Sequence, residues 1–313
     1  MDNIQTFKAN GKLLLTGEYL VLYGAYALAM PVNKGQQMEV QTIKTSNQAE
    51  VIWEAHKPGG LWFKSRFKLP DLSVVETSDA KVTNKLQMIL ITLKQLNPTA
   101  FTKNLSYHFK TQMNFEPEWG FGSSSTLIVM LSRWAKVNPY TLLNFSIGGS
   151  GYDIACGMTS QPIIYQLKGL QPQHHPINFD PPFKSNLYFV YQGKKQDSAK
   201  AIRKFKEETP SEKIQEAVES LNKITEKTLK CDDFDEFCDL MQQHETLIAK
   251  LTGLTPIKSY YPEFEGLMKS LGAWGGDFLL AASRRDEQEL KYYFQQNKLN
   301  PVFRYDDLTI KAH

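Results

Sequence analysis

The residues whose types and spacing most clearly suggest a chemical role lie between positions 120 and 126. There, two glycines and four consecutive hydroxyl side chains precede an apolar run. The glycines permit a tight turn, and the apolar run from Leu127 to Leu131 predicts a buried helix behind it. The first backbone N–H groups of such a helix, and its dipole, favour an anion such as phosphate. Serines that merely cap a core helix produce the same pattern, so this stretch alone supports both interpretations equally.

A second glycine cluster, from Gly148 to Gly157, contains Asp153. An aspartate at the start of a short helix can serve only as its N-cap. Beside a glycine loop it can also present a carboxylate to a cleft and accept a hydroxyl proton. A third cluster, from Leu271 to Asp277, leads into an apolar strand that we expect over residues 278–282.

A polar group, Thr16-Gly17-Glu18, interrupts two apolar segments near the start of the chain. A carboxylate in such surroundings needs a partner, because an unpaired buried charge is costly. Lys12 is the nearest cation in sequence. The alternative to a functional glutamate is a structural ion pair at a strand end.

The elements that position these clusters follow from periodicity and from helix and turn signals. A strand over residues 105–113 leads directly into the first glycine turn, and this context favours the phosphate interpretation. Strands and helices alternate without a regular βαβ rhythm, which predicts an α+β fold. Other expected elements are strands over 4–8, 12–15, 163–167 and 187–191, and helices over 81–96, 126–137, 199–206, 211–230, 234–251, 262–271 and 288–297. A loop over 169–182 suggests domains of residues 1–175 and 176–313.

Composition limits the class of protein. The 313 residues are 42% hydrophobic and 22% charged, as in soluble globular proteins, and the net charge of +3 is too small to indicate nucleic-acid binding. Three cysteines fit a reducing cytoplasm rather than a disulfide framework or a zinc site. The longest apolar region is broken by Glu18 and Gly24 and predicts no membrane span. We therefore expect a cytoplasmic monomer or homodimer without nucleic-acid or membrane partners.

Taken together and in order, the clusters resemble the three signature motifs of the GHMP kinase superfamily, which is named for galactokinase, homoserine kinase, mevalonate kinase and phosphomevalonate kinase. Residues 11–24 resemble motif one of the mevalonate-pathway members, and residues 117–126 are similar to the phosphate loop, Pro-x-x-x-Gly-Leu-Gly-Ser-Ser-Ala. Residues 272–277 resemble motif three, Gly-Ala-Gly-x-Gly-Gly. The resemblance implies a two-domain fold, with an N-terminal domain like ribosomal protein S5 domain 2 and a ferredoxin-like C-terminal domain.

The resemblance also implies roles for the matching residues. Lys12 matches the lysine that lies near the acceptor and the transferred phosphate. Asp153 matches the aspartate that orients or deprotonates the acceptor hydroxyl, and Ser124 matches the serine that reaches Mg²⁺. The residues expected around the ATP phosphates are Gly120, Gly122, Ser123, Ser124 and Ser125. Those expected to bind the acceptor are Glu18, Ser150, Gly151, Gly272, Ala273, Gly275 and Gly276.

Within the superfamily, Glu18 and its neighbours look more like phosphomevalonate kinases than mevalonate kinases. The segment 193–198 resembles a glycine-polar-serine segment of the same branch, and its Lys194, Lys195 and Ser198 are expected to bind a phosphorylated acceptor. For each residue singly, a solvated basic helix start is an equally good interpretation.

Three departures from the motifs stand out. Ser125 replaces an alanine, and Trp274 stands at a usual glycine, where we expect it to narrow or cover the acceptor pocket. No acidic residue occurs from Thr126 to Tyr152, where mevalonate kinase relatives place a Mg²⁺-binding glutamate.

The expected function is ATP-dependent phosphoryl transfer to a mevalonate-pathway acceptor, with phosphomevalonate ahead of mevalonate. The alternatives are a diphosphomevalonate decarboxylase, a sugar kinase and a degenerate GHMP protein that binds nucleotide without turnover. An S5-like RNA-binding module is the weakest alternative, because no aromatic-basic stripe is present.

Overall fold

The computed structural model describes residues 4–310, which divide into two compact units. The first unit comprises the chain up to Gly11, Lys34–Pro117 and Phe121–Met158; the second comprises Lys12–Asn33, Glu118–Gly120 and the chain from Thr159 onward. The boundary proposed between residues 175 and 176 stays a prediction, since this division follows packing and not chain order. No helix in the described part of the chain is both long and apolar enough to cross a membrane.

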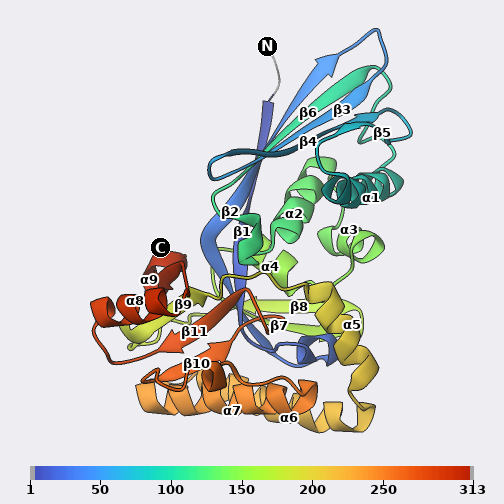
Figure 1. Cartoon of the computed structure of the whole chain (residues 1–313). Helices are drawn as coiled ribbons and strands as arrows, with labels where there is room; N and C mark the ends of the chain where they lie inside the picture. Colours follow the sequence, from blue (N-terminus) through green and yellow to red (C-terminus); the bar gives the residue numbers. More distant parts are fainter. Residues whose placement is uncertain (1–3, 311–313) are drawn as a thin grey trace. The chain divides into compact units, whose positions relative to one another are not determined.

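The first unit is built on a sheet whose inner face carries a large aromatic core. Trp53 and Phe109 stack there with ring centroids 4.9 Å apart, and both are fully buried. Figure 1 shows α1, α2 and α3 grouped near these strands. The sheet order is β5 (Ser73–Thr77), β4 (Gly60–Lys68), β3 (Glu50–Lys57), β6 (Leu105–Met113) and β2 (Ala27–Lys44), with β1 (Ile4–Thr16) paired to β2. The helices are α1 (Ala80–Leu96), α2 (Ser123–Ala135), α3 (Pro139–Ser146) and α4 (Tyr152–Met158).

The second unit contains the antiparallel sheet β10-β11-β9-β12 and a pair of long helices, α6 and α7, which lie side by side (Figure 1). The first residues of β2 also pair here with β7, which in turn pairs with β8. The strands are β7 (Ile163–Lys168), β8 (Gln171–Pro176), β9 (Leu187–Tyr191), β10 (Leu267–Ser270), β11 (Phe278–Ala282) and β12 (Val302–Arg304). The helices are α5 (Ser198–Glu208), α6 (Ser211–Thr228), α7 (Phe234–Thr252), α8 (Glu287–Gln296) and α9 (Tyr305–Leu308). The 3₁₀ turns are η1 (Leu20–Tyr23), η2 (Pro117–Trp119), η3 (Lys184–Asn186) and η4 (Ile257–Tyr260).

Most of the expected elements are confirmed, and three expectations are wrong. Residues 4–16 form one strand, without the break predicted at 9–11. The predicted loop over 169–182 contains β8, because its residues extend the hydrogen-bonded ladder of β7. The helix predicted over 262–271 is replaced by β10, whose four residues are all buried against β11.

A buried group of charged side chains holds the second unit together behind motifs one and three. Glu18, His244 and Lys269 are all fully buried. Lys269 Nζ lies 2.5 Å from Glu18 Oε1 and also donates to the Ser270 carbonyl. His244 Nε2 lies 2.9 Å from Glu18 Oε2 and 3.2 Å from the Gly17 nitrogen. Glu18 thus forms a structural ion pair, which was one of the two interpretations that the sequence allowed. Its cationic partner is Lys269 and not the expected Lys12.

Glu245, the neighbour of His244 on α7, fixes the segment that enters motif three. Its two carboxylate oxygens accept hydrogen bonds from the Ser270 backbone N–H at 3.0 Å, the Ser270 hydroxyl at 3.1 Å and the Ile257 N–H at 3.0 Å. Adjacent residues of α7 therefore anchor both motifs. His244 holds the turn at Gly17, and Glu245 holds the end of β10.

The pKa values of these buried groups shift in different directions because their partners differ. Burial would raise the pKa of Glu18, but the charge of Lys269 and the contacts with His244 outweigh it and hold that pKa below its usual value. Burial, together with the charge of Lys269, lowers the pKa of His244, although the carboxylate of Glu18 opposes this. Burial raises the pKa of Glu245 to about 7, although Lys269 and the hydrogen bonds partly offset this.

The raised pKa of Glu245 predicts a pH-dependent stability. The folded state holds the proton that the unfolded chain has lost, so this group's stabilising contribution declines as pH rises from about 4.5 to about 7. Glu245→Gln cannot titrate. The free energy of unfolding of wild type, measured relative to this variant in urea, should fall by up to about 3 kcal/mol across that range. Parallel pH curves for the two proteins would contradict the assignment.

Candidate active site

The glycine–serine turn opens α2 without a side-chain cap. Gly120 and Gly122 have φ angles of 73° and 90°, and Gly122 is the N-cap residue. The helix begins at Ser123, three residues before the expected start, so the serines occupy its first turn. Because the N-cap residue is a glycine, it has no side chain that could accept a hydrogen bond from the first N–H groups. The interpretation of the serines as helix caps is therefore wrong, and the end of the helix is suited to an anion.

Two of the serine side chains are engaged by groups from other elements of the first unit. The Ser124 hydroxyl accepts a hydrogen bond from Lys85 Nζ at 2.8 Å, and Ser125 donates one to Asp153 Oδ2. Lys85 was missed by the sequence analysis, because it is one of several charged residues on the polar side of α1 and lies 39 residues before Ser124. It brings a cation to the start of α2.

Asp153 lies in the first turn of α4 and is half-buried. Its Oδ1 accepts from the backbone N–H of Ile154 at 3.1 Å. The two acceptor-binding candidates Ser150 and Gly151 immediately precede this helix, and Gly151 has a φ of 87°. Of the predicted site, the first unit therefore brings together the phosphate-loop serines and Asp153.

Motif three forms a tightly wound loop between β10 and β11. Gly272 and Gly275 have φ angles of 66° and 83°, and Trp274 and Asp277 also adopt positive φ. The loop is tied by backbone bonds to the segment after β9. Asp277 N–H donates to the Lys194 carbonyl at 2.8 Å, and Gln192 N–H donates to the Asp277 carbonyl at 2.9 Å. The exposed lysines of segment 193–198 are therefore held beside motif three, while Ser198 is the exposed first residue of α5.

Asp277 connects this loop to the first glycine of the phosphate loop. Its Oδ1 accepts the Gln196 N–H at 3.0 Å, and a Cβ atom added at Gly120 would lie 2.4 Å from its Cγ. Burial raises the pKa of Asp277, while the Gln196 bond and the charges of Lys12 and Lys195 oppose the rise. The second unit thus assembles Lys12, Lys195 and Asp277 at Gly120.

The structure of the second unit bears on two residues that were expected at the acceptor pocket, Trp274 and Glu18. Trp274 is 1% exposed and packs in an apolar cluster with Tyr19 and Phe205, so in this structure it fills the unit's interior and leaves no exposed ring to cover a pocket. Tyr19 also donates from its hydroxyl to the Ala273 carbonyl at 3.0 Å. Both carboxylate oxygens of Glu18 face Lys269 and His244, so direct binding of an acceptor would require this buried ion pair to open. Lys12 belongs to the second unit and Asp153 to the first, and their roles at the acceptor stay predictions.

The side chains around Ser124 do not by themselves fit a magnesium ion. Among residues 4–310, no group of three or more His, Cys, Asp or Glu side chains is arranged to hold a metal. The ammonium group of Lys85 also lies at the Ser124 hydroxyl. Mg²⁺ prefers several oxygen ligands, so a magnesium ion held through nucleotide phosphates stays a prediction.

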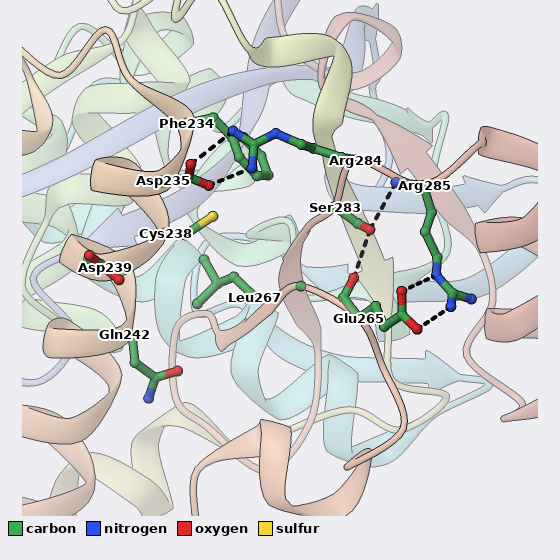
Figure 2. Close-up of a pocket in the computed structure, with 11 residues that line it drawn as sticks. Phe234, Asp235, Cys238, Asp239, Gln242, Glu265, Leu267, Ser283, Arg284 and Arg285 are labelled. Atoms are coloured by element: carbon green, nitrogen blue, oxygen red, sulfur yellow. Dashed lines mark hydrogen bonds and ion pairs between the residues drawn. The ribbon is translucent and has the colours of Figure 1, made fainter.

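A cavity of about 540 Å³ lies elsewhere in the second unit and contains none of the predicted site residues. Figure 2 shows that its two arginines are already paired, Arg284 with both carboxylate oxygens of Asp235 and Arg285 with Glu265. Both of its cations are thus already paired within the protein. The lining residues are Phe234, Asp235, Cys238, Asp239, Gln242, Glu265, Gly266, Leu267, Ser283, Arg284 and Arg285.

Comparison with solved structures identifies the fold. L. major mevalonate kinase in complex with R-mevalonate matches with a TM-score of 0.68 and 15% identity, over 99% of this chain and 97% of that chain. Streptococcus pneumoniae phosphomevalonate kinase with phosphomevalonate and AMPPNP matches with a TM-score of 0.67 and 16% identity, over 96% and 99%. Lactococcus lactis galactokinase with galactose matches with a TM-score of 0.66 and 14% identity, over 96% and 92%. No protein-family model and no curated protein matches the sequence.

The chain has the GHMP kinase fold. The prediction of an α+β, two-domain GHMP architecture is confirmed. Coverage of nearly the whole chain means that the three motifs occur within one complete fold of this kind. At these identities the comparison establishes the fold, and the reaction follows from arguments about the site.

The contact between Gly120 and Asp277 predicts a position where only glycine fits. Gly120→Ala combines a positive φ with a Cβ that displaces the Asp277 carboxylate from its hydrogen bond to Gln196. Gly169→Ala is the matched control, because Gly169 has a φ of 61° and no atom within 4 Å of its added Cβ. In urea unfolding, Gly120→Ala should cost about 1–2 kcal/mol more than Gly169→Ala. Equal costs would show that the carboxylate moves freely.

Proposed function

We propose that this protein is an ATP-dependent small-molecule kinase that acts on a mevalonate-pathway acceptor, with phosphomevalonate ahead of mevalonate. The observation that carries the proposal is the uncapped start of α2, where backbone N–H groups, Ser124 and Lys85 converge without an acidic side chain in the first turn. Such a site suits the phosphates of a nucleotide. The GHMP fold supports the same assignment, because the named matches with this fold include a phosphomevalonate kinase in complex with AMPPNP.

Phosphoryl transfer requires positioned charge more than covalent chemistry from the protein. The bond from the γ-phosphorus to its bridging oxygen breaks as a bond to the acceptor oxygen forms, and ADP leaves with the electron pair. In our proposal Lys12 approaches the transferred group, and Asp153 accepts the hydrogen bond of the acceptor hydroxyl or P–OH and then its proton. Mg²⁺, when bound through the nucleotide phosphates, would neutralise part of their charge.

Lys194 and Lys195 support a phosphorylated acceptor. Their segment is fixed to motif three by the backbone bonds of Asp277, while both side chains are exposed. An anion bound there would gain charge-assisted hydrogen bonds that an unphosphorylated acceptor could not make. This is the argument for placing phosphomevalonate ahead of mevalonate.

The reaction is tested by ADP release from ATP with mevalonate, phosphomevalonate, diphosphomevalonate and galactose in turn. We expect turnover with phosphomevalonate or mevalonate. If the protein binds ATP but releases ADP with none of the four compounds, the kinase proposal is contradicted. That result would favour nucleotide binding without turnover. Release of carbon dioxide from diphosphomevalonate would indicate a decarboxylase, and turnover of galactose alone a sugar kinase.

The basic segment gives a prediction about acceptor preference. Changing both Lys194 and Lys195 to alanine should raise KM for phosphomevalonate about tenfold or more, while KM for mevalonate changes by less than about twofold. Lys204→Ala is the control, because this lysine is exposed on α5 and paired with Glu208. Equal effects on both acceptors would remove the two lysines from phosphate recognition.

A further inference from the structure

Two helices of the first unit approach closely enough for their side chains to interact in pairs. On α2, Ser125 and Val129 are four residues apart and share one face; on α4, Asp153 and Gly157 do the same. A Cβ atom added at Gly157 would lie 3.1 Å from Val129 Cγ2, so the glycine permits a close approach. One turn along, Ser125 meets Asp153.

The Asp153 carboxylate is held at both oxygens within this unit. Its Oδ1 accepts the Ile154 N–H at 3.1 Å, a bond within its own helix. Its Oδ2 accepts the hydroxyl of Ser125, which is 5% exposed and belongs to the longer helix α2. The Ser125 bond thus ties this carboxylate to a different element of the unit.

That tie matters because the segment before α4 is rich in glycines, which restrict the backbone least. Gly148, Gly149 and Gly151 all have positive φ, and an added Cβ at Gly148 would meet no atom within 4 Å. Helix α4 has only seven residues. A carboxylate at the start of a short helix behind such a loop needs an external contact to keep one rotamer.

We propose that Ser125 is a positioning residue for Asp153, holding its carboxylate in the orientation that receives the acceptor's hydroxyl or P–OH. This inference rests on the proposed phosphoryl transfer. The Ser125 hydroxyl donates to Oδ2 of that carboxylate and so fixes the direction in which its remaining lone pairs point. Ser125 thus links the helix that bears the phosphate loop to the group that orients the nucleophile.

The proposal predicts that restoring the motif's usual residue at position 125 lowers activity. Alanine is the residue that the resembling motif has at this position, so Ser125→Ala restores the usual sequence. If the serine were an incidental replacement, this variant would be neutral. If Ser125 holds Asp153, kcat should fall about 5- to 50-fold while the affinity for ATP changes by less than about twofold.

A double-mutant cycle with Asp153→Asn tests whether Ser125 acts through Asp153. Ser125→Ala should lower kcat in the wild-type background and cause no further loss in the Asp153→Asn background. The control is Ser132→Ala, since Ser132 is buried on the same helix and its hydroxyl donates to the Val129 carbonyl of that helix. Unchanged kcat for Ser125→Ala, or an equal loss in both backgrounds, would overturn the proposal.

A readout without turnover separates this inference from the proposed function. With ¹³C-labelled aspartate side chains, the Asp153 carboxyl signal, assigned by its loss in Asp153→Asn, should move in Ser125→Ala and stay in Ser132→Ala. An unmoved signal overturns the pair even if the protein is an active kinase. If the signal moves in Ser125→Ala but the wild-type protein releases no ADP, the contact between Ser125 and Asp153 is supported and its catalytic purpose is refuted. Should Ser125→Ala fail to fold, Ser125→Cys keeps the volume with a weaker donor and should show the same two changes.

Discussion

The ion pair between Glu18 and Lys269 is the interaction on which the second unit depends. Both side chains are fully buried, and removing either one would leave the other charge without its partner at a cost of about 3–5 kcal/mol. A buried ion pair is weak evidence for added stability, and its best-supported use is to fix register. Here it fixes the turn after β1 against the last residues of β10, so motif one and motif three share one anchor.

The first unit meets a different constraint, because in our proposals the start of α2 both binds an anion and supports Asp153. Successive serines divide these tasks. Ser124 faces Lys85, and Ser125, being buried, turns to Asp153. The successive side chains point in different directions because neighbouring residues on a helix are about 100° apart. The serine at position 125, where the motif has alanine, therefore bonds to Asp153 while Ser124 bonds to Lys85.

The fold and the local geometry of the motifs could largely be predicted, whereas most partners could not. Periodicity indicated α1, α6 and α7, and glycine spacing indicated the turns that have positive φ. Lys269 pairs with Glu18 across 251 residues, and no local pattern indicates such a contact. Lys12 was the nearest cation in sequence but proximity along the chain is a poor guide to a buried pair. The short strand β10 was predicted as a helix because a proline before an apolar stretch also signals a helix start.

Trp274 shows how a motif residue can change its task while the fold is kept. Its φ of 41° is strained for a bulky side chain, and its buried indole N–H has no hydrogen-bond partner among the described residues. Both are unfavourable, so the opposing gain must come from burying the ring with Tyr19 and Phe205, a contribution of about 2–3 kcal/mol for a large side chain. A glycine there would leave the loop free. The tryptophan instead fastens motif three to the helices behind it, and the hydroxyl of Tyr19 fastens Ala273 beside it. Motif three is therefore fastened to the interior of the second unit, and in the proposed kinase the exposed side chains held around it would carry the selectivity for the acceptor.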